Sequence, residues 1–303
     1  HRAPENRKMC EHTMRALLKE GAALLEKNGI GEAGLDAWLL MEYVTGKNRT
    51  YYFAHMEEAV PREQEQRYRE LLDRRREHIP LQHLTHQAFF MGHAFFVNEH
   101  VLIPRQDTEI LVEAALCCLK ETESPRLLDM CTGSGCILLS LLLEKPGAAG
   151  VGADISEEAL AVARYNAEHL GVEDRAELLQ SDLFAAPFFA KTGGKQGEKY
   201  DILISNPPYI PTAQIEELME EVRFHDPRQA LDGKEDGLYF YREITQKAGA
   251  YLKDGGWLLY EIGCDQGEAV KRLLEKAGFI GTEIKKDLAG LDRVVCGQKP
   301  PLL

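Results

Sequence analysis

The stretch that decides the fold is Arg126-Leu127-Leu128-Asp129-Met130-Cys131-Thr132-Gly133-Ser134-Gly135-Cys136, in one-letter code RLLDMCTGSGC. Its first five residues read as a short buried strand, and an apolar helix over 136–144 follows the glycines. Glycines between a strand and a helix let the backbone approach a ligand closely, and the helix N-terminus favours a carboxylate or a phosphate. A tight strand-to-helix connection would use the same glycines, so the turn alone is weak evidence for a ligand site.

Beyond Pro104 the chain alternates strands with helices. We expect strands at 126–130, 149–154, 176–180, 201–205, 256–262, 279–286 and 292–298, and helices at 108–121, 136–144, 156–170, 237–252 and 266–277. Such alternation, with nearly continuous apolar strands, predicts an α/β fold whose mostly parallel seven-stranded sheet is covered on both faces. Only a short loop separates the last two strands, which predicts an antiparallel pair at one edge.

The first 80 or so residues differ in kind from the rest. Apolar residues recur at three- and four-residue spacing in 12–28, 32–45 and 61–78, which predicts a small helical bundle over residues 1–83. The aromatic and β-branched segment 84–104 predicts a β-hairpin that joins this bundle to the α/β domain at 105–303. Residues 1–8 have no periodicity and read as a remnant of expression or a frayed arm.

Composition excludes several classes of protein. The 303-residue chain carries a formal net charge of −13, which argues against a protein that grips duplex DNA through a basic surface. No apolar run approaches the roughly 20 residues needed to span a bilayer, and no charged-then-apolar leader opens the sequence. The seven cysteines are odd in number and scattered, so we expect free thiols in the cytoplasm. Five clustered histidines lack a cysteine or carboxylate at ligand spacing, so no metal site is expected.

Polar residues follow the ends of the next three strands. Asp154 lies about twenty residues beyond the glycines, where a carboxylate can accept both hydroxyls of a ribose. Asp182 and Leu183 end the third strand and offer a carboxylate beside apolar side chains suited to an adenine. Asn206 ends the fourth. Because ligands of open α/β sheets bind at the carboxyl ends of the strands, we expect these residues to share one site.

Taken together, these four strand ends resemble those of the class I S-adenosylmethionine-dependent methyltransferases, which have a Rossmann-like fold. A dinucleotide-dependent dehydrogenase would more typically show G-x-G-x-x-G, and this turn lacks the third glycine. The resemblance implies S-adenosylmethionine as cofactor and S-adenosylhomocysteine as product.

The segment Ile204-Ser205-Asn206-Pro207-Pro208-Tyr209-Ile210 predicts the chemistry. An amide nitrogen is a poor nucleophile because its lone pair is delocalised, so an enzyme that methylates it must orient the NH₂ group. The side-chain oxygen of Asn206 and the carbonyl of Pro207 can accept its two hydrogens, the prolines make the loop rigid, and Tyr209 offers a flat face. We therefore expect Asn206, Pro207 and Tyr209 to be catalytic. The other interpretation is a strand ended by prolines, with a tyrosine that only packs.

Further segments narrow the resemblance to one family. The NPPYI motif, with residues 95–109, 226–244, 261–267 and 287–295, resembles the glutamine N5-methyltransferases that modify class I peptide chain release factors. In that family the glutamine of a Gly-Gly-Gln loop enters a pocket around the NPPY segment, and the helical domain helps to hold the protein substrate. A release factor is thus the implied partner.

The resemblance also implies the site residues. Those expected to bind the cofactor are Asp129, Cys131, Thr132, Gly133, Ser134, Gly135, Asp154, Ile155, Asp182, Leu183 and Asn206, with Phe95 or Phe96 closing over the ligands. Those expected to bind substrate are Asn206, Pro207, Pro208, Tyr209, Arg105 and Glu109. Of these, Arg105 and Glu109 are expected to shape the entrance of the site. The chain departs from the family at Cys131, commonly glycine, and at Leu183, often aromatic; we expect adjusted affinity and retained activity.

Rival functions remain open at this point. A glutamine methyltransferase acting on a ribosomal protein has similar motifs. A DNA adenine or cytosine amino-methyltransferase shares the NPPY segment but must flip a base and bind phosphates, which the acidic balance disfavours. A non-catalytic binding module could keep the fold, although it would not need hydrogen-bond acceptors oriented toward a substrate amide. The sequence does not reveal which release factor is modified or the oligomeric state.

Overall fold

The computed structural model describes residues 11–192 and 197–303 and divides into two compact units, residues 1–86 and 87–303. The expectations for residues 1–8 and for Cys10 lie outside the described residues. The six described cysteines are all free thiols, as predicted.

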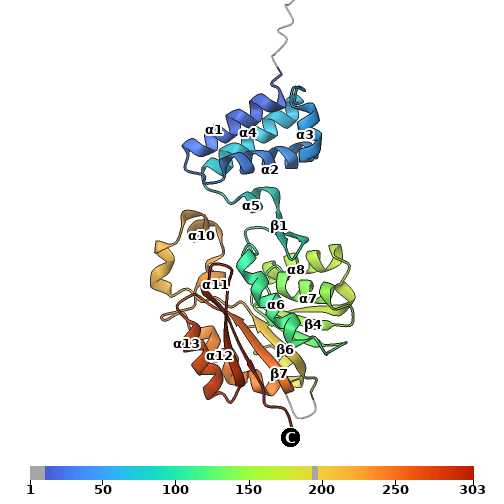
Figure 1. The fold of residues 1–303 in the computed structure, drawn as a ribbon, viewed down its shortest axis with the longest axis vertical. Helices are drawn as coiled ribbons and strands as arrows, with labels where there is room; N and C mark the ends of the chain where they lie inside the picture. The colour runs from blue at the N-terminus through green and yellow to red at the C-terminus, as the bar shows by residue number, and fades with distance from the viewer. Residues whose placement is uncertain (1–10, 193–196) are drawn as a thin grey trace, which may run out of the picture. The chain divides into compact units, whose positions relative to one another are not determined.

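The first unit is a bundle of helices around an apolar core (Figure 1). Its core includes Leu17, Leu40 and Tyr68, all fully buried, and the hydroxyl of Tyr68 donates to the carbonyl of Leu17 at 3.4 Å. The three predicted helices are present, and two short ones were not predicted. The helices are α1 (Met14–Lys27), α2 (Ala33–Thr45), α3 (Arg49–His55), α4 (Arg62–Arg76) and α5 (Leu81–Thr85).

The predicted β-hairpin belongs to the second unit. Strands β1 (Gln87–Phe90) and β2 (His93–Phe96) pair antiparallel through a turn in which Met91 and Gly92 both have positive φ. Phe90 and Phe95 are fully buried, so the hairpin is anchored on the core of this unit through one face.

Seven strands form the main sheet, as predicted. They are β3 (Arg126–Met130), β4 (Ala149–Asp154), β5 (Ala176–Gln180), β6 (Tyr200–Ser205), β7 (Leu252–Glu261), β8 (Ile280–Lys286) and β9 (Asp292–Gln298). Their order in the sheet is β5-β4-β3-β6-β7-β9-β8, with β9 antiparallel to both of its neighbours and the other pairs parallel. The α/β fold with a mostly parallel sheet and an antiparallel pair at one edge is therefore confirmed.

The order of the strands fixes where a ligand can bind. The sheet starts at the inner strand β3, is built outward to β4 and β5, and is then continued by β6 on the other side of β3. Met130 at the end of β3 is level with Ala153 of β4 and with Ser205 of β6. The loops after these strands consequently open at one edge of the sheet, at its topological switch point.

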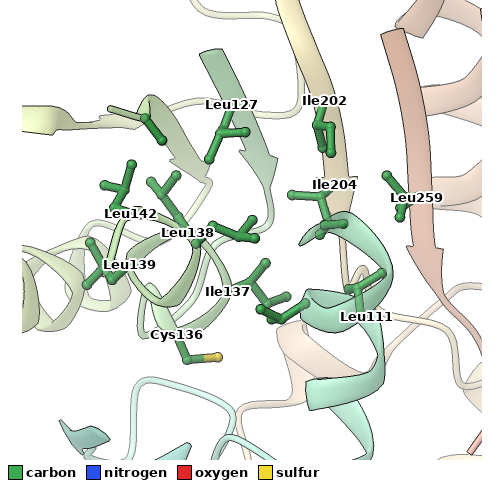
Figure 2. Packing of buried hydrophobic residues seen from close by; sticks show 14 of the residues in the cluster. Leu111, Leu127, Cys136, Ile137, Leu138, Leu139, Leu142, Ile202, Ile204 and Leu259 are labelled. Carbon is green, nitrogen blue, oxygen red and sulfur yellow. The ribbon is translucent and has the colours of Figure 1, made fainter. Parts of the chain in front are cut away.

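Helices cover both faces of the sheet. On one face, α6 (Glu109–Cys118) and α7 (Cys136–Glu144) pack on Leu127, Ile202 and Leu259 (Figure 2). On the other face, α12 (Tyr239–Tyr251) and α13 (Gly267–Lys276) pack on Leu203 and Leu258. Helix α8 (Glu157–His169) packs on β4 and β5. Seven of the nine residues of α7 are buried, and each buried leucine contributes about 1.5–3 kcal/mol, so this helix fixes the turn before it.

Half of the short helical pieces of this unit that the sequence did not predict lie between β6 and α12. They are η3 (Thr212–Glu217), α10 (Glu220–His225) and α11 (Arg228–Leu231), together with η1 (Gln106–Thr108), η2 (Glu173–Arg175) and α9 (Pro187–Thr192) elsewhere in this unit. Prolines precede or begin several of them, as is common at helix N-termini. Such short helices show too little periodicity to be recognised from a single sequence.

Candidate active site

The glycine-rich turn after β3 is held by the end of β4. The backbone N–H of Gly133 donates to Oδ2 of Asp154 at 2.9 Å, and the N–H of Ser156 donates to Oδ1 at 3.0 Å. The N–H of Thr132 donates to the carbonyl of Ala153 at 3.0 Å. Burial raises the pKa of the Asp154 carboxyl, while these backbone donors oppose that change. Asp154 thus shapes the turn in addition to facing the cavity described below.

Asp129, predicted to bind the cofactor, supports the turn from beneath. It is fully buried, and Thr132 donates its hydroxyl to Oδ2 at 2.7 Å. Burial raises the pKa of this carboxyl to about 7, and within the described part of the chain Oδ1 has no hydrogen-bond partner. Asp129 does not line the cavity.

Asn166 on α8 joins the turn to the hairpin, a role that the sequence did not predict. Its side chain is buried, accepts from the N–H of Phe96 at 2.7 Å, and donates to the carbonyls of Phe96 at 3.0 Å and Ser134 at 2.9 Å. Both N–H groups and the oxygen of the amide bond to backbone groups, so this residue fixes the position of the turn relative to β2.

The two positions at which we expect the chain to depart from the family both have left-handed backbone conformations, with φ of +63° at Cys131 and +52° at Leu183. Residues other than glycine rarely adopt this region. Burial raises the pKa of the Cys131 thiol well above its ordinary value. Cys131 is only partly buried, and a thiol of raised pKa is mostly protonated and therefore a weak nucleophile.

A cavity of about 500 Å³ opens above the carboxyl ends of β3, β4, β5 and β6. Most residues predicted to bind the cofactor line it: Cys131, Thr132, Gly133, Ser134, Asp154, Ile155, Asp182, Leu183 and Asn206. Segments 100–105 and 227–230 complete its wall.

A second cavity of about 270 Å³ lies against the NPPY segment. Pro207 and Tyr209 line it, whereas Pro208 lines the larger cavity. Asn206 and Arg105 line both. The two spaces therefore adjoin at Asn206.

The backbone of the NPPY segment is clamped by a loop before α12. The N–H of Ile210 donates to the carbonyl of Leu231 at 3.0 Å, and the N–H of Gly233 donates to the carbonyl of Ile210 at 2.8 Å. A Cβ on Gly233 would lie 2.9 Å from the Tyr209 backbone, and one on Gly237 would lie 2.5 Å from the Tyr209 oxygen. Only glycine fits at these two positions, and the close packing fixes the segment in one conformation.

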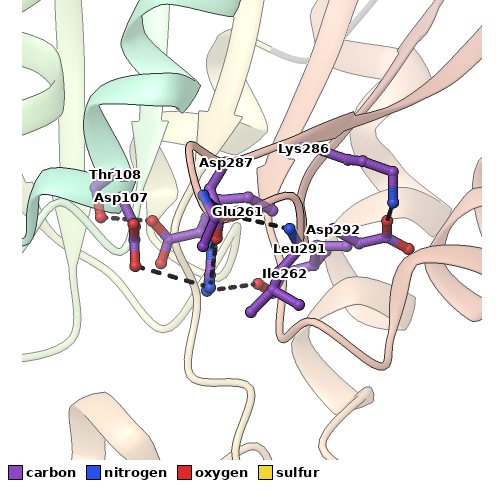
Figure 3. A network of polar contacts seen from close by, with 10 residues as sticks. Asp107, Thr108, Glu261, Ile262, Lys286, Asp287, Leu291 and Asp292 are labelled. Carbon is purple, nitrogen blue, oxygen red and sulfur yellow. Dashed lines mark hydrogen bonds and ion pairs between the residues drawn. The ribbon is translucent and has the colours of Figure 1, made fainter.

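Gln266 and a network of polar residues support the NPPY segment and the wall of the second cavity. Gln266 donates from Nε2 to the carbonyl of Tyr209 at 2.9 Å. Figure 3 shows the network, in which Thr108 donates to the buried carboxylate of Glu261 at 2.5 Å and Arg293 binds Asp287 at 3.1 Å. Arg293 itself lines the cavity. Burial raises the pKa of Tyr209 to about 12, so its hydroxyl stays neutral.

Three residues that were expected to close over the ligands or to shape the entrance lie elsewhere. Phe95 is fully buried in the core beside Phe90, with ring centroids 6.1 Å apart, and Phe96 packs on Tyr165 at 4.9 Å. Glu109 accepts from the N–H of Met91 at 2.9 Å and so ties α6 to the hairpin. None of the three lines either cavity, because the alternation of the strand turns Phe95 into the core and Glu109 is used by the turn.

Comparison with known proteins agrees with this geometry. The family described as "PrmC N-terminal domain" matches residues 16–85, and that described as "Methyltransferase small domain" matches residues 106–238. Release factor glutamine methyltransferases from Moorella thermoacetica and Caulobacter vibrioides are 42% and 41% identical to this chain. The first alignment covers 93% of this chain and 96% of the relative, and the second covers 92% and 93%.

The chain belongs to the family of release factor glutamine methyltransferases. Among solved structures, a protein-(glutamine-N5) methyltransferase from Alicyclobacillus acidocaldarius is similar with 31% identity and a TM-score of 0.43, covering 68% of this chain and all of that one. The hMettl16 catalytic domain is similar in fold, with a TM-score of 0.54 and 14% identity, over 68% of this chain and 76% of that one.

The methyl donor of this methyltransferase family is S-adenosylmethionine, and the larger cavity fits it chemically. Asp154 offers carboxylate oxygens to a ribose, and the turn 131–134 lines the cavity with its backbone, where the glycine lets a ligand approach closely. Leu183 and Ile155 supply apolar surface beside Asp182 for a nucleobase. The cavity volume lies in the range of small-molecule sites, roughly 300–1,000 Å³.

Proposed function

We propose that this methyltransferase transfers the methyl group of S-adenosylmethionine to the side-chain amide nitrogen of the glutamine in the Gly-Gly-Gln motif of class I release factors, and so acts on translation termination in the cytoplasm. The observation that carries the proposal is the position of Asn206, which belongs to the NPPY segment and lines both the large cavity and the NPPY cavity. A methyl donor in the first space and an amide in the second would meet there.

Orientation of the amide is the chief task of the protein in this proposal. The Asn206 side-chain oxygen and the Pro207 carbonyl accept the two amide hydrogens, which turns the nitrogen lone pair toward the larger cavity. Bound S-adenosylmethionine supplies an electrophilic methyl group on its sulfonium. The clamp on Tyr209 and Ile210 keeps these acceptors in place before substrate arrives, so little reorganisation is needed during the reaction.

Proton removal needs no strong base at this site. The nitrogen becomes acidic once it carries the additional methyl group, so its proton can leave to water after transfer. Tyr209 stays neutral because burial raises its pKa to about 12, so it contributes a flat apolar wall against the planar amide.

The size of the second cavity favours a side chain as substrate. About 270 Å³ holds a glutamine side chain and leaves the rest of a protein substrate outside.

Among the residues that the structure describes, no helix has the length and apolarity to cross a bilayer.

Labelled S-adenosylmethionine with candidate substrates tests the proposal. We expect transfer to the glutamine of a Gly-Gly-Gln release factor, located by mass spectrometry, and none to the same factor with that glutamine changed to alanine. Labelling of a ribosomal protein or of DNA in place of the release factor would contradict it.

A further inference from the structure

Arg105 occupies a place in the site that the NPPY chemistry leaves unexplained. It is one of the residues shared by the linings of the two cavities, and with Asn206 it is one of only two polar residues among them. Its side chain is 44% exposed, so a bound substrate can reach the guanidinium.

Asp226 holds this guanidinium from behind. Nη2 of Arg105 lies 3.0 Å from Oδ2 of Asp226, although the two residues are 121 positions apart in the sequence. The Asp226 side chain is only 3% exposed, and within the described ranges its Oδ1 has no hydrogen-bond partner. A buried carboxylate is costly unless it is paired, so its presence here indicates a specific task.

A substrate amide presents two kinds of group to the second cavity. Its NH₂ needs acceptors, which Asn206 and Pro207 supply, and its carbonyl oxygen needs a donor, since a buried oxygen without one costs about 1–3 kcal/mol. Arg293 also lines this cavity, but its guanidinium already donates to Asp287 at 3.1 and 3.2 Å and to the Ile262 carbonyl at 3.3 Å. Arg105 has one hydrogen-bond partner among the described residues, Asp226.

We propose that Arg105 donates to the side-chain carbonyl oxygen of the substrate glutamine and that Asp226 is the positioning residue that aims it. The inference rests on the proposed function. Together with Asn206 and Pro207, this contact would fix the amide at both ends, so that rotation about its last carbon–carbon bond is stopped and the nitrogen faces the methyl donor. An acid group or amine of similar size would meet the wrong pattern of donors and acceptors.

A double-mutant cycle with Arg105→Met and Asp226→Asn tests the pair. We expect Arg105→Met to lower kcat/KM for a Gly-Gly-Gln release factor by about 10–10²-fold, the usual loss for one charge-assisted hydrogen bond, with cofactor affinity by calorimetry nearly unchanged. Asp226→Asn should lower kcat/KM by a smaller factor. The double variant should match Arg105→Met alone, because Asp226 acts only through the guanidinium. Arg105→Lys, which keeps a cationic donor, should recover part of the activity.

The ion pair Arg242–Asp236 gives a matched control. It is a surface pair at 2.7 Å that lines neither cavity, so Arg242→Met should leave kcat/KM unchanged. Additive effects of Arg105→Met and Asp226→Asn, or full activity of Arg105→Met, would overturn the inference. Failure of the unmodified enzyme to label any glutamine would instead overturn the proposed function, so the two failures are distinguishable.

Discussion

The two cavities of the second unit are built in different ways. The larger one rests on turns that directly follow strands, and its central contact joins Gly133 to Asp154, 21 residues apart. The smaller one is lined by segments that lie far apart in the sequence, including Arg105, Tyr209 and Arg293, and Asp226 pairs with Arg105 from 121 positions away. The proposed cofactor site is thus made from local turns, whereas the proposed site for the substrate amide depends on contacts between distant parts of the chain.

This difference separates binding from turnover. Changes in the local turns should alter cofactor affinity and stability, whereas changes around the NPPY segment should alter the rate and leave the cofactor bound. If the variants below changed cofactor affinity and rate together, the two cavities would not have the separate tasks proposed for them.

The largest effect is expected from Asn206→Ala. Loss of one preorganised acceptor costs about 10²–10³-fold in rate, and more where orientation is the main catalytic device. The variant should fold and bind S-adenosylmethionine with modest weakening. Asn206→Asp keeps an acceptor but adds a charge, so its activity should lie between that of Ala and the unmodified enzyme. A methyl-transfer assay at saturating cofactor measures both, and near-normal kcat for Asn206→Ala would leave the NPPY segment as a packing element only.

Asp154→Ala should act on the other cavity. It removes a carboxylate that can bind both ribose hydroxyls, which we expect to cost on the order of 2–4 kcal/mol in cofactor affinity. It also leaves the N–H groups of Gly133 and Ser156 without their acceptor, so the unfolding midpoint should fall as well. Titration calorimetry with S-adenosylmethionine and thermal unfolding measure the two losses, and unchanged affinity would remove Asp154 from the site.

The local character of the larger cavity explains why the sequence predicted it. Strand, glycine turn and acid follow one another along the chain, so periodicity and residue type locate them. The charged residues in and behind the smaller cavity carry no such local signal: Arg293 lines it and Asp226 pairs with Arg105, yet both look like ordinary surface charges in the sequence. The pair Phe95–Phe96 shows a second limit, because adjacent aromatics in a strand point to opposite faces and the sequence does not say which face is the core.

Asn166→Ala tests how far local support extends. The change removes the hydrogen bonds that the amide makes to the N–H and carbonyl of Phe96 and to the carbonyl of Ser134, and should cost about 2–3 kcal/mol of stability with weaker cofactor binding. Asn166→Asp keeps only the acceptor and should lose nearly as much. Urea unfolding with calorimetry measures the effect. A variant as stable as the original would indicate that the hairpin and the turn are held by other contacts.

Asp129→Asn should change how stability depends on pH. The pKa of this carboxyl rises from 3.8 to about 7 on folding, so the folded state holds the proton more tightly. The resulting stabilisation is complete below about pH 4 and is lost as the pH rises toward 7. Asparagine removes this loss but leaves its own amide group unpaired, so at pH 8 we expect a net gain of about 1–2 kcal/mol. Urea unfolding at pH 5 and pH 8 measures it, and a difference between the proteins that is independent of pH would refute the assignment.

The smallest effect is expected at Cys131, where the turn carries strain of its own. A φ of +63° costs a non-glycine residue about 1–2 kcal/mol, and glycine would remove that cost while adding about 0.5–1 kcal/mol of chain entropy to the unfolded state. Cys131→Gly should therefore raise the free energy of unfolding by about 0.5–1 kcal/mol. The same change at Cys296, a buried strand residue in ordinary extended conformation, serves as the control and should destabilise. If Cys131→Gly also destabilises, packing of the thiol in the turn outweighs the backbone strain, and the departure from the family's usual glycine is then a stabilising one.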